Sequence, residues 1–111
     1  MTRPVEVLVR RLPHSEELPL PTYATPGASG ADVAAALTED VALKPMERRA
    51  IPTGLVVAVF PGYDVQVRPR SGLALRHGVT VANAPGTVDS DYRGELMVIL
   101  INLGNKTYTV K

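Results

Sequence analysis

Hydrophobic and polar residues alternate with a period of two in short segments of the chain, as in β-strands that bury one face. Residues 5–10 place three valines on one face and Glu6 and Arg10 on the other. Residues 63–68 alternate in the same way, with a tyrosine and two valines on one face. Both segments are predicted to be half-buried strands.

Two other segments are continuous hydrophobic runs, at residues 55–60 and 96–101. The second is rich in β-branched residues, and such runs are typical of strands covered on both faces. Both are therefore predicted to lie in the core. Residues 107–110 begin one more alternating strand, which runs to the last residue, Lys111, with no closing turn.

Ten prolines and nine glycines are distributed over the whole chain and leave little room for long helices. Turn signals separate the predicted strands; they are Lys44-Pro45, Pro61-Gly62, Ala84-Pro85-Gly86 and Gly104-Asn105. Residues 31–44 lack both glycine and proline, and propensity alone favours a helix there. The valines and the turn-prone residues 38–40 divide that segment into pieces too short for a stable isolated helix. The pattern as a whole predicts an all-β sandwich or barrel of short strands.

A length of 111 residues predicts a single domain, residues 1–111. A domain of this size buries a modest share of its surface, so association with other subunits would add considerable stability. Twelve basic and eleven acidic residues give a net charge of +1, with no basic run and few aromatic residues. We therefore expect no direct nucleic-acid binding.

The absence of cysteine from the sequence excludes disulfides, cysteine-based zinc sites and a thiol nucleophile. The first hydrophobic stretch, residues 5–9, is short and interrupted by Glu6, which fits neither a signal peptide nor a membrane span. We expect a cytoplasmic protein without a membrane association.

The first group of residues that could carry chemistry is Gly27 to Asp32, a glycine-rich loop that brings a carboxylate to the start of an extended segment. By itself it is typical of a turn whose aspartate caps local backbone amides. The second group is Pro69 to Ala74, where Ser71 is predicted to cap a short helix from Leu73 to Arg76. A helix start beside Arg70 also suits a phosphate, because a guanidinium can bond two phosphate oxygens at once.

The third group is Gly86 to Glu95, in which carboxylates, hydroxyls and a ring are concentrated. It superficially resembles a calcium loop, but Arg93 and Leu100 stand where oxygen ligands are required, so calcium binding is rejected. A polar hairpin tip explains the same composition structurally. Phosphate-loop, zinc-protease and serine-hydrolase signatures are absent from the sequence, and His14 and His77 have no spaced partner, which favours surface or loop histidines.

Three segments in this order, SGADVAA, PRSGLA and GTVDSDYRGEL, closely resemble the first three motifs of the trimeric dUTPase family. The resemblance extends from about Leu18 to Asn102. The related dCTP deaminases usually carry a D-P-G-type segment where this chain has residues 89–92, so the dUTPase branch is favoured.

The resemblance implies an antiparallel, jelly-roll-like β fold, the β-clip, with a short helix after PRSG. It also implies a homotrimer with three active sites at the subunit boundaries, each built from motifs of different chains. The reaction would be hydrolysis of dUTP to dUMP and pyrophosphate, which limits uracil incorporation into DNA and supplies dUMP for dTMP synthesis.

Asp89 matches the aspartate that orients and deprotonates the attacking water, a role suited to a carboxylate near the α-phosphate. Thr87, Val88 and Asp89 resemble the hairpin that holds uracil and deoxyribose, with Asn83 on the entering strand and Met97 on the leaving one. A narrow hairpin would exclude a 5-methyl group by steric clash and cytosine by mismatched donors and acceptors. The ring of Tyr92 would lie under the sugar, where a 2′-hydroxyl would be crowded and unsatisfied.

Arg70, Ser71 and Gly72 match the residues that bind the phosphate chain. Asp32 matches the carboxylate that supports a Mg²⁺ ion mainly through water, and that ion would arrive with the nucleotide. The fourth and fifth family motifs, resembling GDRIAQL and RGxGGFGSTG, do not occur in these 111 residues. We therefore expect a chain truncated at its carboxy terminus. Two hypotheses remain open: the amino-terminal portion of an active dUTPase, or a non-catalytic nucleotide-binding or assembly remnant.

Overall fold

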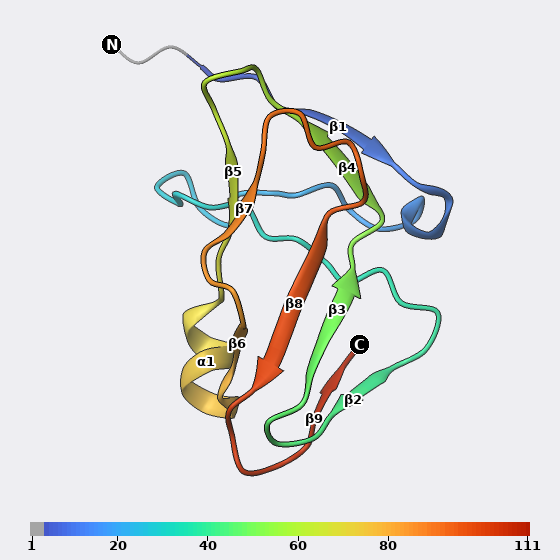
Figure 1. The fold of residues 1–111 in the computed structure, drawn as a ribbon, viewed down its shortest axis with the longest axis vertical. Coiled ribbons are helices and arrows are strands. Elements are labelled where there is room, and N and C mark those ends of the chain that lie inside the picture. Colours follow the sequence, from blue (N-terminus) through green and yellow to red (C-terminus); the bar gives the residue numbers. More distant parts are fainter. Residues whose placement is uncertain (1–3) are drawn as a thin grey trace.

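A computed structural model describes residues 4–111, which contain nine β-strands, one α-helix and one 3-10 helix (Figure 1). In chain order the elements are β1 (Leu8–Arg11), η1 (Pro13–Ser15), β2 (Val41–Leu43), β3 (Arg48–Pro52), β4 (Leu55–Ala58), β5 (Val65–Val67), α1 (Ser71–His77), β6 (Val79–Val81), β7 (Gly86–Val88), β8 (Met97–Asn102) and β9 (Tyr108–Val110). The prediction of an all-β chain with one short helix after PRSG is confirmed.

All of the strand pairs in the described residues are antiparallel. The longest strand, β8, lies between β3 and β6, and three two-stranded sheets surround this unit: β1–β4, β2–β9 and β5–β7 (Figure 1). The domain is elongated and measures 44 × 32 × 24 Å along its principal axes.

A small hydrophobic cluster lies beneath β2, β3 and β9, where Leu43, Ile51 and Val110 are buried and Leu100 of β8 packs against them. The run at residues 55–60 is confirmed as core over β4, although Phe60, beyond the strand, is 60% exposed. The run at 96–101 is different. Leu96 is buried, but the residues of β8 before Asn102 are half-buried or exposed. The prediction that this strand is covered on both faces is therefore wrong for a single chain. The hydrophobic cluster is too small to cover both faces of this strand.

The amino-terminal strand also departs from the prediction. β1 begins at Leu8 rather than Val5, and the three valines at positions 5, 7 and 9 are 51, 44 and 37% exposed. Among the described residues, 4–111, β1 pairs only with β4, so this two-stranded sheet gives it little to pack against. The strand at residues 63–68 is confirmed in shorter form as β5, with half-buried valines on either side of exposed Gln66. Residues 31–44 form no helix; they bend at residues 38–39 and include β2.

α1 begins at Ser71, one residue before the position implied by a serine cap. Arg70 occupies the N-cap position and its side chain makes no capping hydrogen bond, so the prediction that Ser71 is the capping residue is wrong. The helix ends at His77 and is capped by Gly78, whose φ is 72° and whose backbone amide donates to the carbonyls of Ala74 and Leu73. A glycine tolerates this left-handed conformation without strain.

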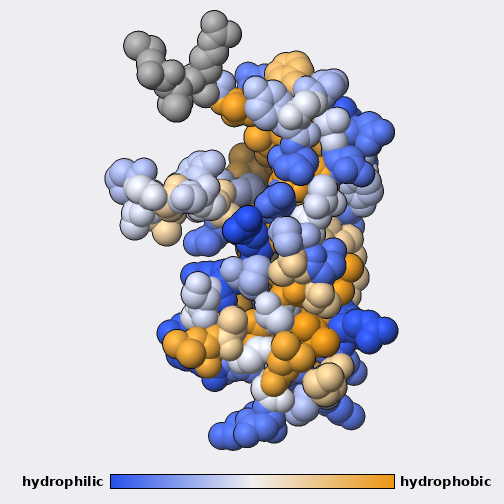
Figure 2. Space-filling view, turned by 60° about the vertical axis from the view of Figure 1, so that its left-hand side comes forward, coloured by the Kyte–Doolittle hydropathy of each residue, from blue (hydrophilic) through white to orange (hydrophobic). Residues whose placement is uncertain are grey.

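Hydrophobic side chains reach the surface on the side of the domain that carries α1, β5 and β7 (Figure 2). Leu75 of α1 is 88% exposed, and Leu103, after β8, is 56% exposed. Patches of this kind often mark surfaces that contact other molecules.

Candidate functional site

The loop of the first motif approaches the start of α1. Asp32 and Thr22 form an isolated antiparallel bridge at the base of the loop. Within residues 4–111 no backbone amide is bonded to the Asp32 carboxylate; instead its Oδ1 lies 3.9 Å from Nε of Arg70. Both side chains are more than half exposed, so the ion pair adds at most about 1 kcal/mol to stability. The structure thus brings the first and second motifs together while leaving their charged groups open to a ligand.

A second guanidinium lies near the first turn of α1. A Cβ added at Gly72 would lie 2.7 Å from Nη2 of Arg76, so the Arg76 side chain folds back over Gly72. Sequence reasoning used Arg76 only to mark the end of the helix. The four-residue spacing from Gly72 is the signal that could have found it, since residues i and i+4 share a helix face.

The third motif leaves β7 in a tight turn. The Tyr92 amide donates to the Asp89 carbonyl at 3.1 Å, and the Arg93 guanidinium donates to the Ser90 carbonyl at 2.7 Å. A polar tip is confirmed, but the expected hairpin of two paired strands is wrong. β7 pairs with β5, whereas β8 pairs with β3 and β6, so the segment between β7 and β8 is a loop joining two sheets.

The predicted nucleoside-binding residues lie between the turn before β7 and the first residue of β8. Asn83 belongs to the turn between β6 and β7, so its placement on a strand is also wrong. Its side-chain amide nitrogen would lie 3.2 Å from a Cβ added at Gly86. Thr87 and Val88 lie on β7, and Met97 is the first residue of β8 and 39% exposed.

Asp89 borders a shallow hollow of about 480 Å³, lined by Gly62, Tyr63, Asp64, Asp89 and Ser90. Val65 and Val88 are paired, so Asp64, one position before β5, and Asp89, one position after β7, lie at the same end of the β5–β7 ladder. The sequence indicated only that Asp64 faces solvent. Its proximity to Asp89 depends on strand register, for which the sequence carries no local signal.

Arg70 and Asp89 lie at opposite ends of the β5–β7 ladder. Asp64 and Asp89 lie at one end of the ladder, whereas Arg70 lies beyond the other end, at the N-cap position of α1. Figure 1 shows that α1 lies at the end of β5. The three residues of β5 and residues 68–69 lie between these two ends, and the path from Asp64 to Arg70 is at most about 20 Å if fully extended. In a single chain Arg70 and Asp89 thus lie at different ends of the ladder.

Tyr92 and Glu95 are tied to each other and to distant segments. The Tyr92 hydroxyl donates to the Glu95 carbonyl at 2.8 Å. The Glu95 carboxylate accepts the Gly54 amide at 2.8 Å and lies 2.7 Å from Nε2 of His14. His14 is thus a surface histidine with a partner 81 residues away, which the sequence did not reveal.

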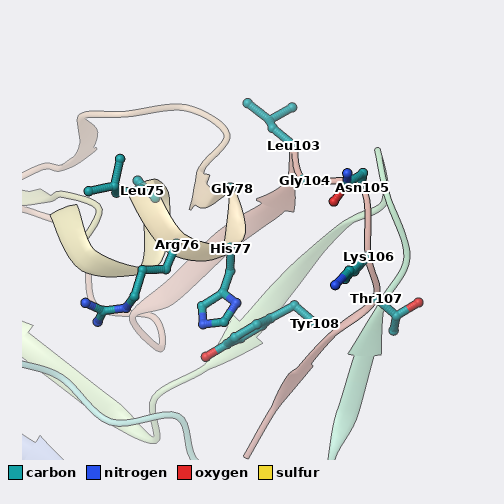
Figure 3. A pocket seen from close by; sticks show the side chains of 11 residues that line it. Leu75, Arg76, His77, Gly78, Leu103, Gly104, Asn105, Lys106, Thr107 and Tyr108 are labelled. Carbon is teal, nitrogen blue, oxygen red and sulfur yellow. The ribbon is translucent and has the colours of Figure 1, made fainter.

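His77 also has a distant partner. Its ring lies against Tyr108, with centroids 5.0 Å apart and planes tilted by 47°. The two rings line a second hollow of about 480 Å³ between the end of α1 and residues 103–108 (Figure 3). The Arg76 side chain extends from the same helix end in this view, while its guanidinium turns toward Gly72.

Within residues 4–111, no three or more His, Cys, Asp or Glu side chains gather closely enough to hold a metal ion. Asp32 beside Arg70 is the carboxylate that could assist an ion carried largely by a ligand and by water. In the same part of the chain, none of the helices has the length and hydrophobicity needed to cross a membrane.

Comparison with known proteins identifies the dUTPase family, whose model matches residues 16–111. The deoxyuridine 5′-triphosphate nucleotidohydrolase of Aquifex aeolicus is 56% identical over 103 residues, which are 93% of this chain and 69% of that protein. The enzyme of the same name from Zymomonas mobilis is 53% identical over 107 residues, covering 96% of this chain and 72% of its own length.

The solved structures that resemble this chain are also dUTPases. A mutant dUTPase from Staphylococcus aureus phage phi11, described with a structural Mg(II) ion, has a TM-score of 0.77 at 28% identity and covers 90% of this chain and 61% of its own. A mutant dUTPase of Staphylococcus bacteriophage 80alpha with bound dUpNHpp has a TM-score of 0.77 at 25% identity over the same shares. Another mutant of that phage enzyme has a TM-score of 0.82 at 20% identity and covers 96% of this chain and 82% of its own. At this low identity the match supports the fold alone.

Proposed function

This chain belongs to the dUTPase family, and from that membership we propose that it hydrolyses dUTP to dUMP and pyrophosphate in sites shared between subunits. The observation that carries the shared site is the position of Arg70 and Asp89 at opposite ends of the β5–β7 ladder. The alternative of a non-catalytic remnant is not favoured, because the relatives are named for the hydrolytic activity.

Asp89 is proposed as the general base that takes a proton from the attacking water. It is exposed beside an open hollow, so a water molecule and an α-phosphate have room to approach it. A positioned carboxylate of this kind contributes about 10²–10⁴-fold to a rate. The shift of electrons from the water oxygen to phosphorus is balanced by departure of pyrophosphate.

The segment from Asn83 to Met97 is proposed to recognise the nucleoside. Backbone groups at Thr87 and Val88 can bond the pyrimidine edge, and the exposed ring of Tyr92 offers a flat surface for deoxyribose. A ribose 2′-hydroxyl against that ring would lack a partner, which lowers affinity for UTP.

The second and first motifs are proposed to hold the triphosphate. Arg70 supplies a guanidinium, and Ser71 and Gly72 supply a hydroxyl and backbone amides at the start of α1. Asp32, 3.9 Å from Arg70, orients that guanidinium and would support Mg²⁺ through water. Such an ion, when bound with the nucleotide, neutralises charge on the phosphates.

A homotrimer is proposed as the assembly that completes each site. Leu75, Leu103 and the half-buried residues of β8 leave hydrophobic surface available for other subunits.

A net charge of +1 with no basic run favours a free nucleotide over nucleic acid as the ligand. A nucleotide substrate and the absence of a membrane-spanning helix from residues 4–111 fit our proposal of a cytoplasmic enzyme.

Pyrophosphate release from dUTP with Mg²⁺ tests the activity, with dCTP, dTTP and UTP as competitors. The protein made from its complete gene should hydrolyse dUTP selectively, and chelation of Mg²⁺ should lower the rate. The 111-residue chain should be compared with a chain extended by the fourth and fifth family motifs. Lack of dUTP-selective hydrolysis by both proteins would refute the assignment.

Mixed subunits test the shared site. Asp89→Asn and Arg70→Ala proteins, each nearly inactive alone, should regain activity when unfolded and refolded together. If each site takes these residues from different subunits, about a quarter of the sites in an equal mixture carry both intact residues. No recovery in proteins shown by sedimentation to form mixed trimers would contradict sharing, and a stable monomer would contradict the trimer itself.

A further inference from the structure

The carboxylate of Glu95 connects the third motif to the turn between β3 and β4 and to the amino-terminal segment. We propose that Glu95, braced by His14, is a positioning residue that holds the Tyr92 ring in place and thereby sets the preference for deoxyribose over ribose. This inference rests on the proposed function, in which Tyr92 packs under the sugar.

The contact between Tyr92 and Glu95 is direct. The Tyr92 hydroxyl donates to the backbone carbonyl of Glu95 at 2.8 Å, although the ring itself is 43% exposed. Gly94 lies beneath the same hydroxyl, since a Cβ there would be 2.6 Å from Tyr92 Oη. The ring is thus held by its polar end while its faces stay open to a ligand.

Glu95 is itself held through its neighbour in the chain. Leu96 is 5% exposed, and its amide donates to the Leu55 carbonyl at 2.7 Å. Its carbonyl accepts the hydroxyl of buried Thr53 at 2.6 Å. These bonds anchor the backbone after Glu95 to β4 and to the β3–β4 turn.

The side chain of Glu95 adds a second anchor. One carboxylate oxygen, Oε2, accepts the Gly54 amide at 2.8 Å and lies 2.7 Å from His14 Nε2. That oxygen is an acceptor, so His14 Nε2 has to carry a hydrogen for the contact to be a bond. The Glu95 side chain is only 25% exposed, so water competes weakly for these bonds.

His14 is brought there by the packing of η1 against Gly54. The Ser15 hydroxyl and the Leu12 amide both donate to the Gly54 carbonyl at 2.7 Å. Gly54 has a φ of 69°, and a Cβ on it would overlap Ser15. The position of His14 is therefore determined by buried contacts rather than by a loose surface loop.

If Glu95 loses its carboxylate, the 92–95 turn loses its bonds to Gly54 and His14 and is anchored only by the backbone bonds of Leu96. The Tyr92 ring then gains freedom to move away from the sugar, and a 2′-hydroxyl meets less crowding. The kcat/KM for UTP should fall less than the kcat/KM for dUTP, so the dUTP/UTP ratio of the two values should decrease. A residue that served folding alone would lower both values by the same factor.

The experiment measures kcat/KM for dUTP and for UTP with the protein made from its complete gene. Glu95→Ala should lower the dUTP/UTP ratio about tenfold, the size expected for loss of hydrogen bonds to a charged group. Glu95→Gln keeps an oxygen acceptor for Gly54 and should restore most of the ratio. His14→Ala should give a smaller loss. Glu17→Ala, which removes an exposed carboxylate outside this network, is the matched control and should leave the ratio unchanged.

Tyr92→Phe keeps the ring and removes only the hydroxyl, so it keeps the proposal testable even if Glu95→Ala does not fold. Its loss in ratio should resemble that of Glu95→Ala, and the double variant should be no worse than either, because both changes break one linkage. An unchanged ratio in Tyr92→Phe, equal losses for both nucleotides, or additive losses would overturn the inference. Absence of dUTP hydrolysis by the wild-type protein would instead overturn the proposed function, and this inference with it.

Discussion

The third motif and the first motif differ in how firmly the rest of the domain holds them. Residues 89–96 are bonded to β4, to the β3–β4 turn and to His14 through the contacts of Glu95 and Leu96. The loop at residues 25–31 is mostly exposed, and the structure gives it one internal backbone bond, from the Ala28 amide to the Thr25 carbonyl at 3.1 Å. Cβ atoms added at Gly27 and Gly30 would meet nothing within 4 Å.

This difference indicates that the two parts of the site have different roles. The surface proposed for base and sugar is built before a nucleotide arrives, which limits the entropy lost on binding and favours selectivity. The surface proposed for phosphate and Mg²⁺ is open, so the ligand and neighbouring subunits would complete it. Five substitutions test the two halves of this comparison.

The largest effect is expected from Asp89→Asn, because an amide cannot take a proton from water. It should lower kcat for dUTP by about 10²–10⁴-fold. Steady-state pyrophosphate release measures kcat, and the melting temperature should stay within a degree or two of wild type because Asp89 is exposed. A kcat within threefold of wild type would exclude Asp89 as the base.

Gly54→Ala should be the most destabilising change on the firmly held side. The residue has a φ of 69°, and the new methyl group would overlap Ser15. Left-handed strain and overpacking each cost about 1–3 kcal/mol, so the free energy of unfolding should fall by about 2–5 kcal/mol. Urea denaturation followed by circular dichroism measures it. A loss below 0.5 kcal/mol would show that η1 does not pack on Gly54 as described.

Thr53→Val tests one bond that anchors Leu96 while keeping the side-chain shape. The Thr53 hydroxyl is buried, donates to the Leu96 carbonyl and accepts the Leu55 amide at 3.2 Å. Removing it leaves both backbone groups short of a partner and should reduce stability by about 1–3 kcal/mol. Thermal unfolding provides the measurement, with Thr109→Val on the exposed position of β9 as the control.

The smallest effect is expected from Gly30→Ala in the first-motif loop. Open space surrounds this position, so stability should change by no more than about 0.5 kcal/mol. Gly94→Ala is its counterpart in the third motif, where the new Cβ would be 2.6 Å from the Tyr92 hydroxyl and should reduce discrimination against UTP. If Gly30→Ala and Gly94→Ala changed the free energy of unfolding and the discrimination against UTP by the same amounts, the two regions would not differ in how firmly they are held.

Local features of the sequence were sufficient for much of the fold. Alternation at residues 63–68 and 107–110 predicted β5 and β9, and the hydrophobic run at 55–60 predicted a buried β4, because these patterns depend on neighbouring residues alone. The valines at 5–9 followed the same pattern but are exposed. A period of two identifies a strand with two faces, yet it does not say whether anything covers them.

The sequence by itself determined the family and the three motifs, since residue order and spacing carry that information. The tertiary structure decided which residues meet. Arg70 with Asp32, Asp64 beside Asp89, and His14 with Glu95 are pairs separated by many positions in the chain. It also decided that Arg70 and Asp89 stand at opposite ends of one ladder. Strand register and long-range packing set these distances, and no local pattern of side chains encodes them.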